Sequence, residues 1–284
     1  MAKNRNKKST EKKKTSNEPT MADKADKFYC YQESVQEPEH EVEIFDLIYR
    51  EAYGKKPLTL REDFCGTFAV CCEWVKSDKD RRAVGIDLCP ETLGWGIENN
   101  LNKLDPSAKE KVEVLEKDVR SQTTPKVEIL AAQNFSFWIF KTREEVVDYF
   151  RIAYGNLQDK GIMIMDMMGG KESYATDVTD KRTIVKGKDG FKYRWEQAYF
   201  NPVTSDCSFY IHFKFGDGSR MKRAFEYHWR FWTIPEVREM LAEAGFKKSL
   251  VYWDVAPEDE EEKWSAVDEA DNDDSWLCYI VGIK

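Results

Sequence analysis

The sequence lacks any long apolar segment. No run approaches the roughly 18 apolar residues that a membrane span needs, and no apolar signal segment opens the chain. The seven cysteines contain no CxxC pair and no spacing typical of metal ligands, which argues against both a disulfide framework and a metal site. We therefore expect a cytoplasmic protein with reduced thiols, no bound metal and no membrane association.

A strongly basic composition is also missing. The net charge is −8, which argues against a protein that binds nucleic acid over its whole surface. Basic residues gather in one segment without aromatics, since residues 1–14 carry seven Lys and Arg against one Glu, a net charge of 7 − 1 = +6. We expect residues 1–26 to form a disordered basic tail, which either contacts RNA or anionic surfaces or only keeps the chain in solution.

Negative charge gathers near the other end of the chain. Residues 254–274 carry eleven Asp and Glu against one Lys, a net charge of 1 − 11 = −10. This predicts an acidic loop, and two interpretations of it stay open. The loop either attracts a cationic amine substrate or is a solvated flexible segment.

What the chain does contain is enough apolar surface for a sizeable core, with 41% hydrophobic and 13% aromatic residues. Apolar runs alternate with helical patterns over residues 27–284, which predicts one α/β domain with a buried, mostly parallel sheet and helices on both faces. The predicted strands cover 58–64, 83–88, 112–115, 127–134, 162–167, 250–253 and 276–282, and the predicted helices cover 69–76, 91–104, 142–156 and 234–244.

The alternation stops at about residues 185–232. Three long aromatic segments follow one another there, separated by turn-like sequences at 201–204 and 216–219. This pattern predicts two hairpins and a three-stranded antiparallel β insertion. The middle strand places Phe209 and Ile211 on one face, which we expect to pack on the domain or on a partner subunit in a homodimer.

Candidate binding residues lie where two neighbouring predicted strands end. Gly66 forms a tight turn after the first strand, so that backbone can approach a ligand closely. Asp87 ends the next strand, about 20 positions on, and can accept both hydroxyls of a ribose. The G-x-G-x-x-G pattern of dinucleotide sites is absent, and Asp63 suits an ammonium group better than a pyrophosphate. Asp118, just past the third strand, can meet an adenine amino group, although each acid singly is also typical of a helix cap or a loop.

Four short motifs together resemble one family. D-x-C-G-T at 63–67, G-I-D at 85–87, K-D-V at 117–119 and N-F-S-F at 134–137 are similar to motifs of class I S-adenosylmethionine-dependent methyltransferases, and residues 228–246 look like that family's last helix and strand. Within the family the chain looks most like bacterial-type small-molecule enzymes, including the glycine N-methyltransferase group. The resemblance implies S-adenosylmethionine as cofactor and a Rossmann-like sheet of seven strands, the last of them antiparallel.

The resemblance also implies binding roles at several turns. These are Asp63, Cys65 and Gly66 for the methionine portion, Asp87 for the ribose, Leu88, Asp118 and Val119 for the adenine, and Asn134 and Phe135 for the route to the methyl group. Phe68 departs from the pattern, because the family usually carries Gly or Ala there, which makes the turn bulkier.

Two further side chains are candidates for cofactor binding. Arg61 and Asp63 are two apart in a strand and face the same way, so that Arg61 binds either the cofactor carboxylate or a neighbouring acid. Tyr31 precedes the first long helix and either folds over the cofactor or packs in the core.

On the substrate side, the catalytic candidates are His212, Tyr210 and Asn134. His212 and Tyr210 share a face of the insertion, where His212 can serve as a general base or as a structural hydrogen-bonding residue. Methyl transfer from a sulfonium is an in-line displacement, for which alignment matters most and a base is needed only for a protonated nucleophile.

We therefore predict a methyltransferase that transfers a methyl group to N or O of a small-molecule acceptor. Three alternatives remain. They are an RNA or protein methyltransferase docked through the basic tail, a non-catalytic S-adenosylmethionine-binding module, and a nicotinamide-dependent oxidoreductase, which the missing glycines disfavour.

Overall fold

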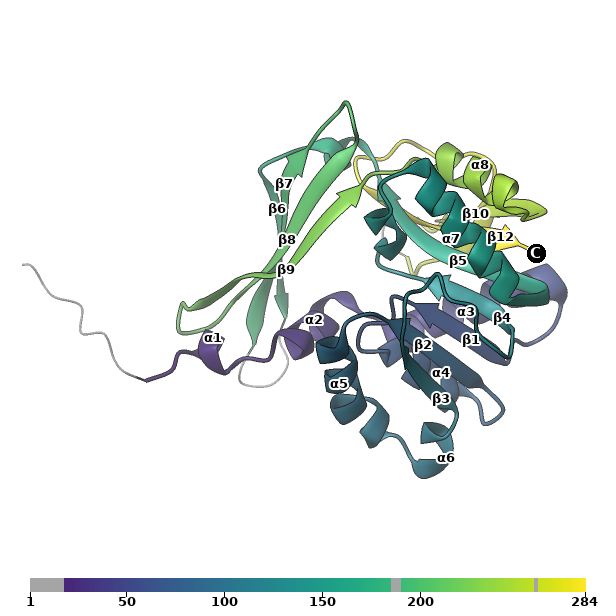
Figure 1. The fold of residues 1–284 in the computed structure, drawn as a ribbon. Coiled ribbons are helices and arrows are strands. Elements are labelled where there is room, and N and C mark those ends of the chain that lie inside the picture. Colours follow the sequence, from purple (N-terminus) through teal and green to yellow (C-terminus); the bar gives the residue numbers. More distant parts are fainter. Residues whose placement is uncertain (1–17, 185–189, 258–259) are drawn as a thin grey trace, which may run out of the picture.

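The computed structural model describes residues 18–184, 190–257 and 260–284. The strands of its main sheet are β1 (Thr59–Asp63), β2 (Arg82–Asp87), β3 (Val112–Glu116), β4 (Val127–Ala132), β5 (Leu157–Gly169), β10 (Lys248–Asp254), β11 (Trp264–Val267) and β12 (Trp276–Ile283). They form one eight-stranded sheet in the order β11-β10-β12-β5-β4-β1-β2-β3 (Figure 1).

The directions of these strands confirm the predicted Rossmann-like sheet. β1 pairs in parallel with β2 and β4, β4 with β5, and β2 with β3. β12 runs antiparallel to β5 and to β10. The prediction of seven strands was wrong by one, because Trp264–Val267 of the predicted acidic loop pairs with β10 as an additional edge strand.

Helices cover both faces of the main sheet (Figure 1). α3 and α4 pack with one apolar cluster, and α7 and α8 pack with another on the opposite face. None of the helices in the described ranges is long and apolar enough to cross a membrane. The helices are α1 (Met21–Lys24), α2 (Lys27–Val35), α3 (Pro38–Tyr53), α4 (Ala69–Ser77), α5 (Pro90–Asn99), α6 (Pro106–Lys109), α7 (Arg143–Asn156) and α8 (Ile234–Ala244), with 3-10 turns η1 (Leu101–Lys103), η2 (Ser136–Ile139) and η3 (Lys171–Tyr174).

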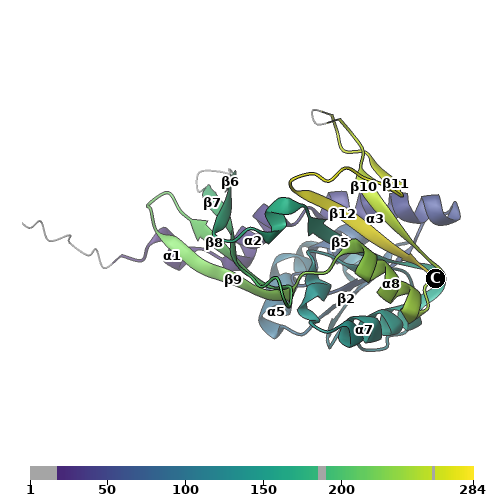
Figure 2. The ribbon, with the colours of Figure 1, turned by 90° about the horizontal axis from the view of Figure 1, so that it is seen from above.

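A second, antiparallel sheet projects from one end of the main sheet (Figure 2). Its strands are β6 (Val178–Ile184), β7 (Phe191–Phe200), β8 (Asp206–Lys214) and β9 (Arg220–Arg230), so the insertion has four strands and begins before residue 185, where it was predicted to begin. Ile211 and Phe213 of β8 pack with Cys30 of α2, and Phe209 packs in the main core. The apolar face therefore covers the domain itself, and the homodimer stays a prediction.

The predicted basic tail is only partly described. Residues 1–17 lie outside the described ranges, but Met21–Lys24 form α1, which contradicts the prediction of disorder up to residue 26. Thr20 caps this helix, and the backbone N–H of Met21 donates to Asp217 in the β8–β9 turn at 2.8 Å. Contacts with the second sheet thus order the end of the segment.

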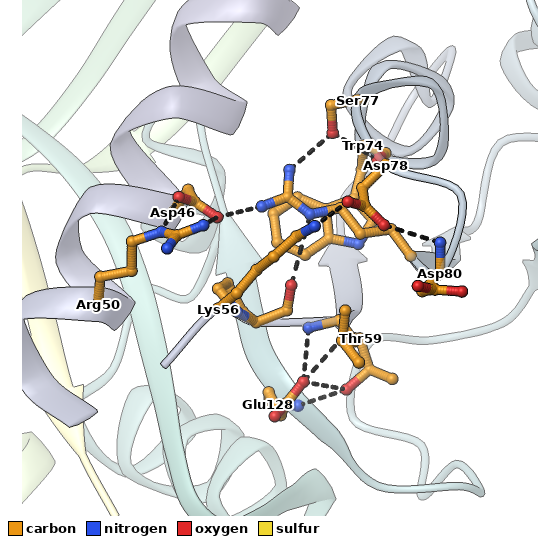
Figure 3. Close-up of polar contacts among 12 residues, drawn as sticks. Asp46, Arg50, Lys56, Thr59, Trp74, Ser77, Asp78, Asp80 and Glu128 are labelled. Carbon is orange, nitrogen blue, oxygen red and sulfur yellow. Dashed lines mark hydrogen bonds and ion pairs between the residues drawn. The ribbon is translucent and has the colours of Figure 1, made fainter. Parts of the chain in front are cut away.

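Polar side chains join the elements at the amino ends of the parallel strands (Figure 3). Glu128 at the start of β4 accepts hydrogen bonds from the backbone N–H of Leu58 at 2.6 Å and Thr59 at 3.2 Å, and pairs with Lys55 at 2.8 Å. The guanidinium of Arg81 lies 3.9 Å from the Trp74 ring centroid. The polar contacts at the amino edge of the sheet therefore hold the fold together. The cavities lie at the opposite, carboxyl edge.

Candidate functional site

The predicted Gly66–Asp87 pair lies at the carboxyl edge of the sheet. Gly66 has a φ of +54°, a conformation that glycine adopts without strain, and its N–H donates to Asp87 at 2.9 Å. The second oxygen of Asp87 accepts from the N–H of Cys89 at 2.8 Å. Both residues line a cavity of about 250 Å³, called here the smaller cavity.

A larger cavity of about 500 Å³ adjoins the smaller one. Tyr31, Asn134, Tyr227 and Trp229 line both cavities, and we call these four residues the junction. They come from α2, from the loop after β4 and from β9. Two ligands bound in the two cavities would therefore meet at the junction.

The loop that carries Asn134 is held by a buried acid. Asn134 and Phe135 have φ values of +58° and +55°, a left-handed conformation that is costly for residues with side chains. The carboxylate of Asp166 in β5 accepts from the N–H of Asn134 at 2.8 Å and from that of Phe135 at 2.9 Å. Burial raises the pKa of Asp166 to about 7. Phe135 lines the larger cavity, so both residues of this predicted motif lie at the site.

Arg61 makes its polar contacts with other residues inside the protein. Its Nε lies 2.6 Å from the carboxylate of Asp63, and both side chains are fully buried. Its other nitrogens donate to the carbonyl of Val119 at 2.6 Å and to that of Ser121 at 3.0 Å. The structure thus decides between the two interpretations of Arg61 in favour of the internal ion pair.

The same ion pair occupies Asp63, which the sequence suggested for binding an ammonium group. One carboxylate oxygen takes the bond from Arg61, and the other accepts from the hydroxyl of Tyr149 at 2.9 Å. Asp63 borders the smaller cavity, but its charge is already compensated by Arg61. An ammonium group in this cavity is therefore better matched by another acid.

Glu62 is that acid, and sequence analysis missed it. It lines the smaller cavity, and its Oε2 accepts from the backbone N–H of Cys71 at 3.1 Å. Burial raises the pKa of Glu62 to about 7, and Asp87 and Asp63 add to this shift. The sequence did contain a signal for Glu62. Side chains alternate between the two faces of a strand, so Arg61 and Asp63 lie on one face of β1 and Glu62 lies on the other.

Gln133 is a second residue that sequence analysis missed. It follows β4, lines the smaller cavity and is only 5% exposed. Neither atom of its side-chain amide has a hydrogen-bond partner among the described residues. Since buried amides are normally satisfied, Gln133 fits a ligand that supplies a donor and an acceptor.

Phe68, the departure from the family pattern, stays out of the cavities. It adopts a left-handed φ of +44° and is fully buried. A Cβ added at Gly96 of α5 would lie 2.6 Å from its ring, so the glycine makes room for it. The bulkier turn is accommodated by the helix behind it and leaves the smaller cavity unfilled.

Four predicted adenine or methionine contacts lie outside the lining of the smaller cavity. Asp118 pairs with Arg120 at 2.7 Å, and this hydrogen bond lowers the pKa of Asp118. Val119 and Cys65 are buried, and Leu88 is 63% exposed. Of these, only Leu88 presents an exposed apolar surface next to Asp87, where an adenine could pack.

Tyr31 occupies the place predicted for a lid. Burial raises the pKa of Tyr31 to about 12, and the nearby hydroxyl of Tyr227 opposes this shift. Its ring centroid lies 4.8 Å from that of Phe225 in β9. This contact joins α2 to the second sheet over the junction.

His212 and Tyr210 lie on the face of β8 opposite to Ile211, which lines the larger cavity. His212 Nε2 lies 3.0 Å from Glu196, and its Nδ1 accepts from the N–H of Arg223 at 3.1 Å. Neither His212 nor Tyr210 is among the residues that line the two cavities. Alternation along the strand turns both side chains away from the domain, and their catalytic role stays a prediction.

Comparison with known proteins gives structural neighbours only. No family model and no curated protein matches the chain. DesVI from Streptomyces venezuelae is 13% identical, with a TM-score of 0.66 over 90% of this chain and 95% of that one. CalS10, an amino pentose methyltransferase from Micromonospora echinaspora, is 12% identical, with a TM-score of 0.65 over 89% and 95%.

KedS8, a sugar N-methyltransferase from a Streptoalloteichus species, is 12% identical, with a TM-score of 0.64 over 98% of this chain and 99% of that one. At these identities the likeness establishes the fold, a Rossmann-like sheet with an antiparallel insertion, over nearly the full length of each protein.

Proposed function

We propose that the chain is an S-adenosylmethionine-dependent methyltransferase that transfers a methyl group to N or O of a small molecule. The observation that carries this proposal is the pair of cavities that meet at the junction. The smaller cavity lies at the carboxyl edge of a mostly parallel sheet, where α/β proteins bind nucleosides. Its junction with the larger cavity gives a donor and an acceptor one place to react.

The residues of the smaller cavity fit this cofactor. Asp87 can accept the ribose hydroxyls, because each carboxylate oxygen has a second lone pair beside its bond to a backbone N–H. Glu62 supplies negative charge for an ammonium group, and the unpartnered amide of Gln133 can bind the amino-acid carboxylate. The solved structures of similar fold are themselves named as methyltransferases, which supports the assignment.

S-adenosylmethionine supplies a methyl group on a positively charged sulfur. The chain's own contribution is alignment and exclusion of water, since an in-line displacement requires the three reacting atoms to lie in a row. Tyr31, Tyr227 and Trp229 surround the point where the cavities meet, and Asp166 fixes the loop of Asn134. A cavity of about 500 Å³ suits a small acceptor rather than a polymer.

Isothermal titration with S-adenosylmethionine, S-adenosylhomocysteine and NADPH tests the proposal. We expect micromolar binding of the first two and none of the third. Asp87→Ala should weaken binding at least about tenfold, or 1.4 kcal/mol, because the ribose hydroxyls lose their acceptor. Asp80→Ala, at an exposed acid outside the cavities, is the matched control. Binding of NADPH alone, or equal affinities of the two variants, would contradict the assignment.

We also propose a cytoplasmic location for this enzyme. All seven cysteines are free thiols, which supports a reducing, cytoplasmic location. A small-molecule acceptor is the partner that the larger cavity supports, and the described part of the chain holds no cluster of metal-ligating side chains.

A further inference from the structure

The larger cavity is rich in carboxyl groups. Its charged lining residues are Glu37, Glu41, Asp166, Asp180, Asp254 and Glu262, against the bases Arg182 and His40. An anionic acceptor would be repelled by this excess of acids, and a cation would be attracted.

Most of these acids already have partners within the protein. Asp166 accepts two backbone N–H groups, and Asp254 accepts from the N–H of Ala256 at 3.0 Å and from that of Lys263 at 2.8 Å. Glu262 accepts from the indole N–H of Trp264 at 3.0 Å. Asp180 lies 3.5 Å from Arg182.

Glu41 is different. It projects from α3, and its Oε2 is shielded from solvent without a geometric hydrogen bond among the described residues, although the hydroxyl of Tyr279 lies close enough to lower its pKa. A buried carboxyl oxygen in this state costs free energy unless a ligand satisfies it. Because it lines the larger cavity, a ligand in that cavity can reach it.

Glu41 interacts electrostatically with acids near both cavities. Burial raises its pKa well above the usual value, and the charges of Asp166 and Glu62 raise it further. Asp166 holds the loop of Asn134 at the junction, and Glu62 lines the smaller cavity. Glu41 therefore lines the larger cavity and interacts electrostatically with the acid that holds the loop of Asn134 and with the acid that lines the smaller cavity.

We infer that the acceptor is a cationic amine and that Glu41 binds its ammonium group and takes up the proton that must leave before methylation. This inference rests on the proposed function and specifies its acceptor. In the reaction the N–H proton passes to the Glu41 carboxylate, the freed nitrogen lone pair forms the N–CH₃ bond, and the S–CH₃ bond breaks with its electron pair left on sulfur. Charge and atoms balance without a further reactant.

The remaining walls of the larger cavity suit the same ligand. Trp195, Tyr227 and Trp229 line it with aromatic rings, and their centroids lie 5.9 Å apart between Trp195 and Tyr227 and 4.5 Å apart between Tyr227 and Trp229. Aromatic faces attract cations and pack against apolar groups. The cavity thus favours an amine that also carries an apolar body.

Titration of the S-adenosylhomocysteine complex with matched ligands tests the inference. The probes are benzylamine and cyclohexylamine, each compared with the alcohol and the carboxylate of the same body. We expect each amine to bind at least about tenfold more tightly than its two counterparts. Glu41→Gln should remove most of this preference, about tenfold in amine affinity, because a neutral amide loses the charge-assisted bond. With S-adenosylmethionine in place of S-adenosylhomocysteine, methylated product should appear by mass spectrometry with the amines only.

Glu43→Gln is the matched control, because Glu43 is an exposed acid on the same helix. Thermal melting of each variant checks its folding, and Glu41→Asp, which keeps the charge, provides a second variant that should retain the amine preference in part. Equal binding of amines and alcohols, or equal effects of the Glu41 and Glu43 variants, would overturn the inference. Absence of S-adenosylhomocysteine binding would instead contradict the proposed function itself.

Discussion

At the scale of single residues, the acids at the carboxyl edge differ by their partners. Asp63 is balanced by a buried guanidinium, whereas Glu62, one position earlier, has no ion pair with a cationic side chain among the described residues. From the sequence alone, Asp63 was the candidate for binding an ammonium group. Because Asp63 is paired with Arg61, Glu62 is the better candidate for that role. Burial raises the pKa of Glu62 to about 7.

This shift predicts a pH-dependent affinity for S-adenosylhomocysteine. As pH rises through about 7, Glu62 loses its proton and becomes the anion that attracts the ligand's ammonium group. We expect affinity to increase roughly tenfold from pH 6 to pH 8, measured by isothermal titration. Asp63 and Asp87 face the same carboxyl group and oppose its ionisation. Glu62→Gln should flatten the profile, and an unchanged slope in that variant would assign the dependence to another group.

At the scale of elements, the turn after β1 depends on the helix beside it. Phe68 keeps the left-handed conformation that glycine would adopt more easily, and its buried ring offsets the backbone cost. The ring is accommodated because α5 presents Gly96 there. One glycine in α5 thus compensates for the missing glycine in the turn.

Two glycines in α5 provide a matched test of this packing. A Cβ at Gly96 would lie 2.6 Å from the Phe68 ring and 2.6 Å from the carbonyl oxygen of Thr67, whereas a Cβ at Gly94 would meet nothing within 4 Å. We expect Gly96→Ala to reduce the free energy of unfolding by about 1–3 kcal/mol, and Gly94→Ala to raise it by about 0.5–1 kcal/mol. Urea unfolding measures both, and similar effects of the two substitutions would contradict the packing described here.

The two strands that sequence analysis missed share a physical cause. β6 and β11 each lie at the edge of a sheet, where one side of the strand has no partner and apolar side chains are not required. Val178–Ile184 is mostly exposed and carries three charged residues, and Trp264–Val267 follows an acidic run. Neither segment carries the apolar pattern by which buried strands are recognised.

At the scale of the whole molecule, the junction is assembled from distant parts of the chain. Tyr31 on α2 and Tyr227 on β9 line both cavities, although nearly two hundred positions separate them in the sequence. The second sheet and α2 therefore cover the cavities together. A ligand in either cavity contacts both elements.

This arrangement predicts where a ligand slows hydrogen exchange. Saturation with S-adenosylhomocysteine should protect amides of α2 (27–35) and of residues 225–229, because Tyr31, Phe225 and Tyr227 line the smaller cavity. α8, which packs beside α7 and lines neither cavity, should be unchanged. Mass spectrometry of peptides resolves these segments. Protection confined to the β1–α4 turn would indicate that the cover does not respond to the ligand.

The sequence by itself determined the features that depend on neighbours along the chain. Apolar periodicity predicted α4, α7, α8 and the central strands, and the turn at Gly66 with Asp87 at the next strand end predicted a nucleoside site. Only the tertiary structure decided that Arg61 pairs with Asp63, that His212 faces away from the cavities, and that Glu41 lines the larger one. The physical reason is that charge compensation, burial and the partner of a polar atom are set by contacts between segments far apart in the chain, which local patterns do not encode.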